Sequence, residues 1–163
     1  MNVRDVSVRR LSIVSSRPFD EVVARLSLGI GRPDMILFRK ALTEAQTPGQ
    51  LEAAVSAAIG PSELMEFGRF DAGEVLRKAG DTQAPRVLRL LVGNPLIMKE
   101  MAKLVPDAAS YAPVTLLVDA RADGVHISYD SMASLIAPYG SRQASSVAEA
   151  LDAKVEQLLR AAT

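Results

Sequence analysis

The stretch Arg89–Gly140, RLLVGNPLIMKEMAKLVPDAASYAPVTLLVDARADGVHISYDSMASLIAPYG, decides most of the fold. It begins with an apolar strand pattern that runs into Gly93-Asn94-Pro95. Asn94 is of a residue type that caps helices, and Pro95 suits a first helical turn, so a helix should follow. Further along, two strand-forming segments flank Asp123-Gly124, a pair typical of tight hairpin turns. The stretch therefore predicts a strand, a helix and a hairpin in that order.

The predicted hairpin closes in a two-residue type I′ turn at Asp123-Gly124, because both central residues of that turn need positive φ. In this register Val118 lies opposite Tyr129 on one face of the hairpin. On the other face, Arg121 lies opposite His126. Since side chains alternate along a strand, the first face should meet helices, while the second should stay polar and open.

Apolar periodicity and capping residues predict the elements at the two ends of the chain. The first strand covers residues 6–13, and its alternation slips at Arg9-Arg10. The slip indicates either a bulge, which we prefer, or a strand that starts only at Arg10. A helix should open at Pro18. The last helix should start near Ser145 or Ser146, because Glu149 completes a capping box from Ser146.

Between these ends, residues 33–45 and 47–60 predict two helices, the second opened by a capping box. A strand at about residues 64–71 and a short helix that ends near Gly80 should follow. The predicted order is strand, three helices, strand, helix, strand, helix, the two hairpin strands and two helices. Only the hairpin strands must be antiparallel from local chemistry.

Composition favours a single globular domain that spans residues 1–163. Hydrophobic residues make up 48% of the chain, whereas aromatic residues make up 4%, so the core should be aliphatic. Lys plus Arg and Asp plus Glu both number 19, which gives zero net charge. Because a domain that neutralises several phosphates carries a basic excess, we expect no nucleic-acid partner.

The chain has no cysteine, which excludes disulfides, thiolate nucleophiles and Cys-ligated metals. One histidine without cysteine cannot form the usual zinc site, so we expect neither a metal nor another cofactor. No apolar run has the length of a signal peptide or a membrane helix. We therefore expect a soluble cytoplasmic protein without a membrane partner.

Four short motifs occur in order along the chain: Gly93-Asn94-Pro95, Tyr111-Ala112-Pro113, Asp123-Gly124 and Ser128-Tyr129-Asp130. Their order resembles the bacterial family called domain of unknown function 302. The resemblance covers about Val8 to Ala162, with the helical section at residues 33–60 as the departure. It implies an α+β fold whose antiparallel sheet has helices on one face, similar to the grouping that includes the TATA-box-binding protein. The family has no established activity, so the resemblance implies no function.

The first candidate site lies at Gly93 and Asn94, where a strand turns into a helix. Unpaired backbone N–H groups at a helix start suit a phosphate or carboxylate, and Arg89 on the preceding strand could help to hold such an anion. The alternative is structural. In that case Gly93 permits the turn, Asn94 caps the helix and Arg89 lies on the surface.

The second candidate site lies at Ser128 and Asp130, which share the open hairpin face with His126. Asp130 could act as a general base or bind a ligand hydroxyl, or else it or Ser131 caps the next helix. A catalytic triad of Ser128, His126 and Asp130 is not expected. Alternate residues of one strand point the same way, but they are not aimed at one another as a proton relay requires.

These features favour a protein that binds a small molecule or an anion without catalysis. A self-associating structural or interaction module is the alternative, and an enzyme of unknown reaction is the second alternative. Residues Met35–Phe38 place apolar groups on every side of one helical turn. The helix at 33–45 should therefore form a homodimer contact or close as a lid over a ligand.

Overall fold

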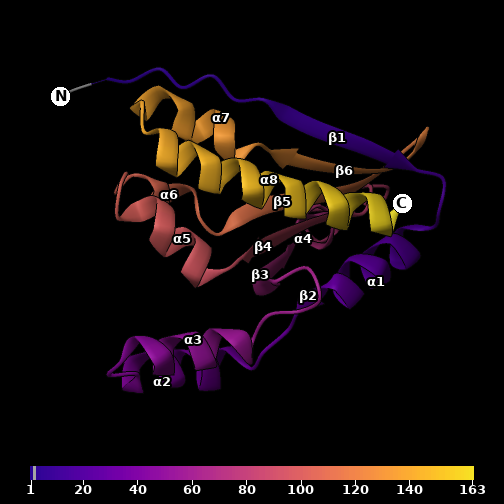
Figure 1. Ribbon diagram of the computed structural model, residues 1–163. Coiled ribbons are helices and arrows are strands. Elements are labelled where there is room, and N and C mark those ends of the chain that lie inside the picture. The colour runs from indigo at the N-terminus through magenta and orange to yellow at the C-terminus, as the bar shows by residue number, and fades with distance from the viewer. Residues whose placement is uncertain (2) are drawn as a thin grey trace.

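The computed structural model describes Met1 and residues 3–163 (Figure 1). In this part of the chain, the strands are β1 (Arg10–Ser15), β2 (Ile30–Gly31), β3 (Leu64–Asp71), β4 (Val87–Gly93), β5 (Val114–Arg121) and β6 (Gly124–Asp130). They form one sheet in the order β1-β6-β5-β4-β3-β2. Neighbouring strands are antiparallel, except that the short β2 runs parallel to β3. The predicted α+β class with an antiparallel sheet is confirmed.

One face of the sheet is covered by α1 (Phe19–Gly29), α5 (Pro95–Ala102), α6 (Ala108–Tyr111), α7 (Met132–Ile136) and α8 (Arg142–Ala162), as Figure 1 shows for α5 to α8. The helices α2 (Met35–Glu44) and α3 (Pro48–Ser56) form an arm that extends away from this layer. A short helix, α4 (Ala72–Lys78), connects β3 to β4, and a 3₁₀ turn, η1 (Ala137–Tyr139), follows α7. None of the helices described is long and apolar enough to span a membrane.

The main core lies between the sheet and the helical layer and is aliphatic, as composition predicts. Alternate residues of β4 and β5 are buried because their side chains point toward the helices. The apolar stripe of α8 packs against them. The buried members from these elements are Leu88, Leu90, Val92, Leu116, Val118, Leu151, Val155, Leu158 and Leu159. Each fully buried side chain of this size stabilises the fold by about 1.5–3 kcal/mol.

The α2–α3 arm has a small core of its own and joins the sheet through a narrow neck. Phe38 is buried in this core and packs edge-on against Phe67 of β3, with ring centroids 6.4 Å apart. In the neck, a Cβ on Gly31 would lie 2.0 Å from the carbonyl oxygen of Ala58, and one on Gly60 would lie 2.5 Å from the nitrogen of Gly31. Glycine is required there because two backbones cross in contact.

The predicted hairpin register is wrong by two residues. Val118 lies opposite Ile127, and Arg121 lies opposite Gly124, so the turn residues are Ala122 and Asp123. The turn is not type I′, because neither Ala122 nor Asp123 has the positive φ that this turn requires. Gly124, which follows the turn, has a φ of 139°. An even shift keeps every side chain on its predicted face.

Gly124 is needed where β6 passes β1. A Cβ at this position would lie 2.7 Å from the carbonyl oxygen of Ser15 and 3.0 Å from Cγ1 of Val14. These contacts join residues more than 100 positions apart in sequence, so local turn chemistry could not reveal them. The close approach of β1 places the glycine after the turn instead of inside it.

Two boundaries and two short elements also differ from the sequence predictions. β1 begins at Arg10, so the strand without a bulge is correct. α8 begins at Arg142, because the Ser141 hydroxyl accepts a hydrogen bond from the Ala144 N–H and caps the helix earlier than predicted. The short elements β2 and α6 were not predicted, since each has too few residues for a periodic pattern.

A buried carboxylate, Asp152 of α8, joins three elements. Its Oδ1 accepts hydrogen bonds from the Tyr129 hydroxyl at 2.5 Å and the Met132 N–H at 2.8 Å. Its Oδ2 accepts from the Ser131 hydroxyl at 2.5 Å and the Ala133 N–H at 3.2 Å. Ser131 also caps α7 by accepting from the Ser134 N–H. The carboxylate therefore holds the end of β6 and the start of α7 against α8.

Replacing Gly124 with alanine should lower the free energy of unfolding by about 3 kcal/mol or more. The change adds a steric contact with Ser15 to the cost of a positive φ, which alone is roughly 1–2 kcal/mol. Gly140→Ala is the matched control, because Gly140 has φ 71° and no atom within 4 Å of its Cβ position. Urea denaturation of both variants compares them. Equal costs would contradict the contact with β1.

Replacing Asp152 with alanine should destabilise the protein by about 3–5 kcal/mol, because three buried donors and one partly buried donor lose their acceptor together. Tyr129→Phe removes one of these donors and should cost about 1–2 kcal/mol. Asp130→Ala is the control, since its ion pair with Arg10 is partly exposed and should contribute less than about 1 kcal/mol. Chemical denaturation measures all three. Similar values for Asp152 and Asp130 would refute the central role of Asp152.

Candidate functional site

The sheet surface opposite the helical layer, which we call the open face, brings together residues from five strands. Alternate positions of β1, β6, β5 and β4 point to this face, and Phe70 of β3 lies directly across from Arg89. The open face consists of Arg10, Ser12, Val14, Phe70, Val87, Arg89, Leu91, Thr115, Leu117, Asp119, His126, Ser128 and Asp130. Apolar, hydroxyl and charged side chains are therefore mixed on it.

Most charged groups of the open face are paired with one another. Arg10 donates to both oxygens of Asp130, at 2.7 and 2.8 Å. These hydrogen bonds hold the pKa of Asp130 below its ordinary value. Arg121, at the hairpin end, forms an ion pair with Asp119. These carboxylates are therefore already neutralised by neighbouring guanidinium groups.

Arg89 differs from the other arginines of this surface. Its Nη2 donates to the Thr115 hydroxyl at 3.2 Å, and it makes no ion pair with any described residue. Phe70 beside it is 55% exposed, and Leu91 and Leu117 are half-buried. Arg89 is thus a cation surrounded by apolar groups in the middle of the sheet.

Two shallow cavities flank this arginine. The first, of about 190 Å³, is lined by Arg89, Phe70, Leu91, Gly68 and Arg69. The second, of about 130 Å³, is lined by Arg10, Thr115, Leu117, Ser128, Tyr129 and Asp130. The predicted site residues Arg89, Ser128 and Asp130 therefore border adjoining hollows of one surface. Ser128 itself is buried, with 7% of its surface exposed.

Gly93 and Asn94 have structural contacts at the end of β4. Gly93 is buried, and a Cβ there would lie 3.4 Å from Pro113 and 3.5 Å from the ring of Phe67. Oδ1 of Asn94 accepts from the Leu96 N–H at 2.8 Å, which caps α5. Its Nδ2 donates to the carbonyl oxygen of Glu63 at 2.9 Å. Asn94 therefore links α5 to the segment before β3.

The serine and histidine of the open face do not form a nucleophile with its base. The Ser128 hydroxyl lies 3.1 Å from the Ser12 hydroxyl. Nε2 of His126 lies 2.8 Å from a carboxylate oxygen of Asp123. This hydrogen bond holds the pKa of Asp123 below its ordinary value. Ser128 is therefore bonded to Ser12 instead of His126, and His126 is bonded to Asp123 instead of Asp130.

Sequence reasoning missed Asp152, which lines a cavity of about 460 Å³ between α7 and α8 together with Arg9 and Ser131. Burial, followed by the hydrogen bond to Asp152, raises the pKa of Tyr129, so this phenol stays protonated. Because both carboxylate oxygens of Asp152 accept two hydrogen bonds each, they are committed to the fold. The sequence signal that could have identified Asp152 is its position as an acidic residue within the apolar stripe of α8.

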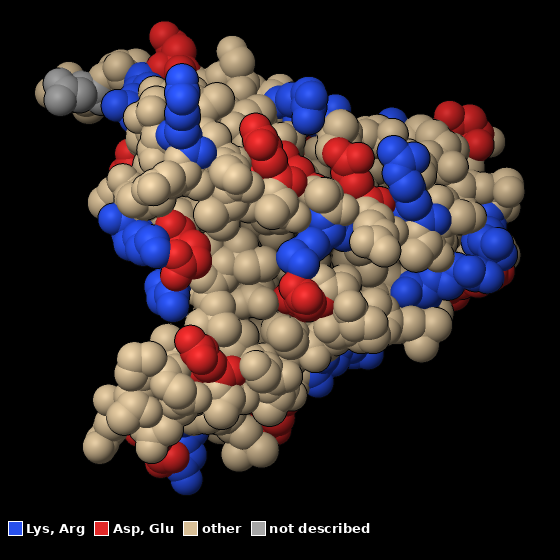
Figure 2. Space-filling view, in the orientation of Figure 1, with Lys and Arg blue, Asp and Glu red and all other residues tan. Residues whose placement is uncertain are grey.

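The exposed apolar groups of α2 are Ile36, which is 80% exposed, and Leu37, whereas Phe38 is buried inside the arm. A homodimer contact through this helix, as the sequence predicts, would therefore use Ile36 and Leu37. Figure 2 shows that the arm carries few charged groups on the visible side. On the same side of the main body, positive and negative side chains are interspersed.

No group of three or more Asp, Glu or His side chains in the described part of the chain is arranged to hold a metal ion. The open face, with an arginine that makes no ion pair with any described residue, is the candidate site.

Asn94→Ala should destabilise the protein by about 1–2 kcal/mol, since a helix cap and a hydrogen bond to Glu63 are both lost. Asn94→Asp keeps the cap but loses the Nδ2 donor, so it should still cost about 1 kcal/mol. Ser141→Asp is the control, because Ser141 caps α8 without a second bond of this kind and aspartate is an equally good cap. If thermal melts show both aspartate variants to be neutral, the contact with Glu63 has no energetic importance.

Comparison with known proteins gives the family and no activity. The family model described as domain of unknown function DUF302 matches residues 38–162. The crystal structure of an uncharacterized conserved protein DUF302 from Bacillus stearothermophilus superposes with a TM-score of 0.66 and 14% sequence identity, covering 94% of this chain and 98% of that one. At that identity the likeness concerns the fold alone. No curated protein matches the chain. Since the family model spans more than half of its residues, the chain belongs to the DUF302 family.

Proposed function

We propose that the open face binds a small anion with an apolar portion, such as a short-chain or aromatic carboxylate, without catalysis. Arg89 would hold the anionic group, and the apolar side chains beside it would hold the rest of the ligand. Among the residues predicted from sequence, Arg89 would contact the ligand, and the buried Ser128 would lie at the margin of the site. Asp130 would border the site as part of its ion pair with Arg10.

The single observation that supports the proposal most is the absence of a carboxylate partner for Arg89. Of the three arginines at the open face and its hairpin end, Arg10 pairs with Asp130 and Arg121 pairs with Asp119. Only Arg89 lacks such a partner among the described residues. A guanidinium presents a planar set of donors that matches a carboxylate in a bidentate manner. An anionic ligand would give Arg89 the kind of partner that Arg10 and Arg121 already have.

The surroundings of Arg89 favour an anion that also has an apolar part. Phe70 lies opposite Arg89 on β3, and Leu117 lies opposite it on β5. Inorganic phosphate would leave these side chains in water, whereas an alkyl or aromatic group would cover them and gain about 25 cal/mol for each Å² removed from water. The ligand class is therefore amphipathic.

The size of the hollows limits the affinity. Typical small-molecule pockets measure roughly 300–1,000 Å³, and the cavities beside Arg89 measure about 190 and 130 Å³. The ligand would be only partly enclosed. We therefore expect a dissociation constant of about 1 mM for a simple carboxylate.

Binding without chemistry follows from how the reactive groups are engaged. General acid or base catalysis needs a titratable group within hydrogen-bonding reach of the reacting atom. On the open face Asp130 is bonded to Arg10, and His126 is bonded to Asp123. Both groups are therefore already hydrogen-bonded to protein partners outside the surroundings of Arg89. Binding is therefore proposed ahead of an enzymatic role.

Titration with octanoate, followed by ¹⁵N–¹H NMR, tests the proposal. Shifts should concentrate at Arg89, Leu91 and Thr115, and phosphate at the same ionic strength should produce smaller ones. Arg89→Met should raise the dissociation constant for octanoate at least about tenfold, because the charge-assisted hydrogen bonds are lost while the apolar stem remains.

Arg39→Met is the matched control, since Arg39 lies on the exposed side of α2 and makes no ion pair with any described residue. It should leave octanoate binding unchanged. Equal octanoate affinity in the wild type and Arg89→Met, or shifts confined to other surfaces, would overturn the proposal.

A further inference from the structure

The free edge of β1 has the features of a protein interface. β1 is the terminal strand on one side of the sheet, and the other terminal strand, β2, has only two residues. An unpaired strand edge can add another strand, so proteins usually protect edges with charges, prolines or bulges. Arg10 begins β1 and Arg9 and Arg17 flank it, but no charged residue lies between Leu11 and Val14.

The hydrogen-bond phase of β1 shows which groups face outward. The Ser131 N–H donates to the carbonyl oxygen of Arg9 at 2.9 Å, so Arg9 bonds toward β6. In an antiparallel ladder, residues that bond to a given neighbour alternate along the strand. The backbone N–H and C=O groups of Arg10, Ser12 and Val14 therefore point away from the sheet. Three consecutive bonding positions are available at the edge.

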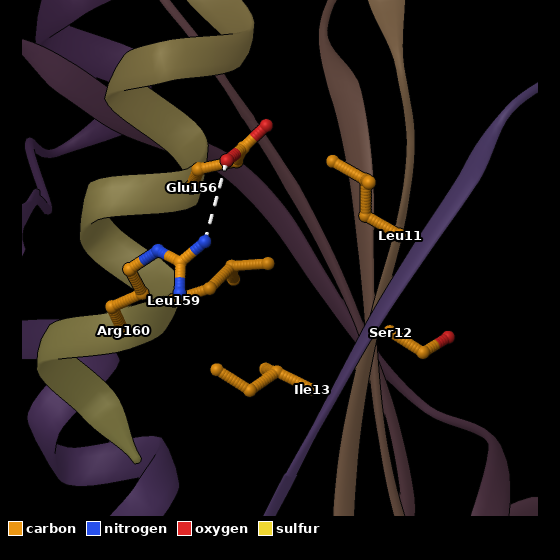
Figure 3. Close-up of a pocket in the computed structure, with 6 residues that line it drawn as sticks. All are labelled: Leu11, Ser12, Ile13, Glu156, Leu159 and Arg160. Atoms are coloured by element: carbon orange, nitrogen blue, oxygen red, sulfur yellow. Dashed lines mark ion pairs between the residues drawn. The ribbon is translucent and has the colours of Figure 1, made fainter.

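A groove beside this edge provides an apolar lining. It has a volume of about 180 Å³ and lies between β1 and α8, with Leu11 and Ile13 facing Leu159 (Figure 3). Glu156 and Arg160 border it and form an ion pair at 3.7 Å, marked by the dashed line in Figure 3. The side chain of Arg160 is 73% exposed, so this pair lies at the rim of the groove.

We propose that a second copy of this chain pairs its β1 with this edge in antiparallel orientation, with a two-fold axis through Ser12. In that register Ser12 bonds to the partner's Ser12, and Arg10 bonds to the partner's Val14. On the helical side, Leu11 lies against the partner's Ile13. All three outward-facing positions are then satisfied in both copies, and the two sheets become continuous.

The charges beside the groove favour a second copy over an unrelated strand. Glu156 and Arg160 border the same cavity as Ser12, one turn apart on α8. A two-fold axis through Ser12 reverses the direction of the partner's helix, so Glu156 faces the partner's Arg160 and Arg160 faces the partner's Glu156. The surface is therefore complementary to itself. The dimer contact lies on β1 and α8 instead of α2.

Charge reversal tests this arrangement by sedimentation velocity of the full chain. The wild type should be a dimer. Glu156→Arg places two like charges at each symmetry-related position and should raise the dimer dissociation constant at least about tenfold. Arg160→Glu should do the same. Both side chains are at the surface, so neither variant should unfold.

Mixing the two single variants provides a rescue. A heterodimer of Glu156→Arg with Arg160→Glu restores opposite charges at both contacts, so it should form where each variant alone is monomeric. The double variant Glu156→Arg/Arg160→Glu should be dimeric by itself. Glu44→Lys, on the exposed i,i+4 pair of α2, is the matched control and should remain dimeric.

Amide hydrogen exchange identifies the pairing itself. The Ser12 and Val14 amides should be protected in the wild type at high concentration and should lose that protection in Glu156→Arg. A wild type that is monomeric up to millimolar concentration overturns the proposal, as does a dimer in which these amides exchange freely. A dimer disrupted by Ile36→Glu but not by Glu156→Arg would also overturn it, in favour of α2.

Discussion

The buried carboxylate of Asp152 is the contact on which the helical layer depends. It accepts from two hydroxyls and two backbone N–H groups at the junction of β6 and α7. A buried charge is tolerated only when its partners are complete, and an apolar stripe alone would allow α8 to slide by a turn. Asp152 permits one register, because only one position meets four donors. The placement of α8 then determines the groove beside β1.

The same sheet presents two different surfaces once its helical face is covered. The open face has Arg89 among apolar groups, and the β1 edge has unpaired backbone groups. If β1 pairs about a two-fold axis perpendicular to the sheet, both open faces lie on the same side of one continuous sheet. Ligand binding would then use the open face, and self-association would use the β1 edge of the same sheet. Neither proposal depends on the other.

Local sequence signals predicted the elements whose ends depend on nearby residues. Asn94 caps α5, and Thr47 with Gln50 forms the capping box of α3, because each side chain bonds to backbone within three residues. The open-face positions of Ser128 and Asp130 followed from strand alternation, which survives an even shift in register, whereas the sequence linked Arg89 only to the site at Gly93 and Asn94. The hairpin register itself was mispredicted, because Gly124 is required by its close approach to Ser15 and not by the turn.

The resemblance of its motif order implied the α+β class, and the sequence by itself determined most helices and strands and which hairpin side chains share a face. These depend on periodicity and capping, whose free energies arise between residues a few positions apart. Only the tertiary structure decided that Asp152 meets Tyr129, that Asn94 meets Glu63 and that Arg89 has no acidic partner in the described part of the chain. Such contacts join residues far apart along the chain. Their geometry is set by how the sheet and helices pack, a property of the whole fold.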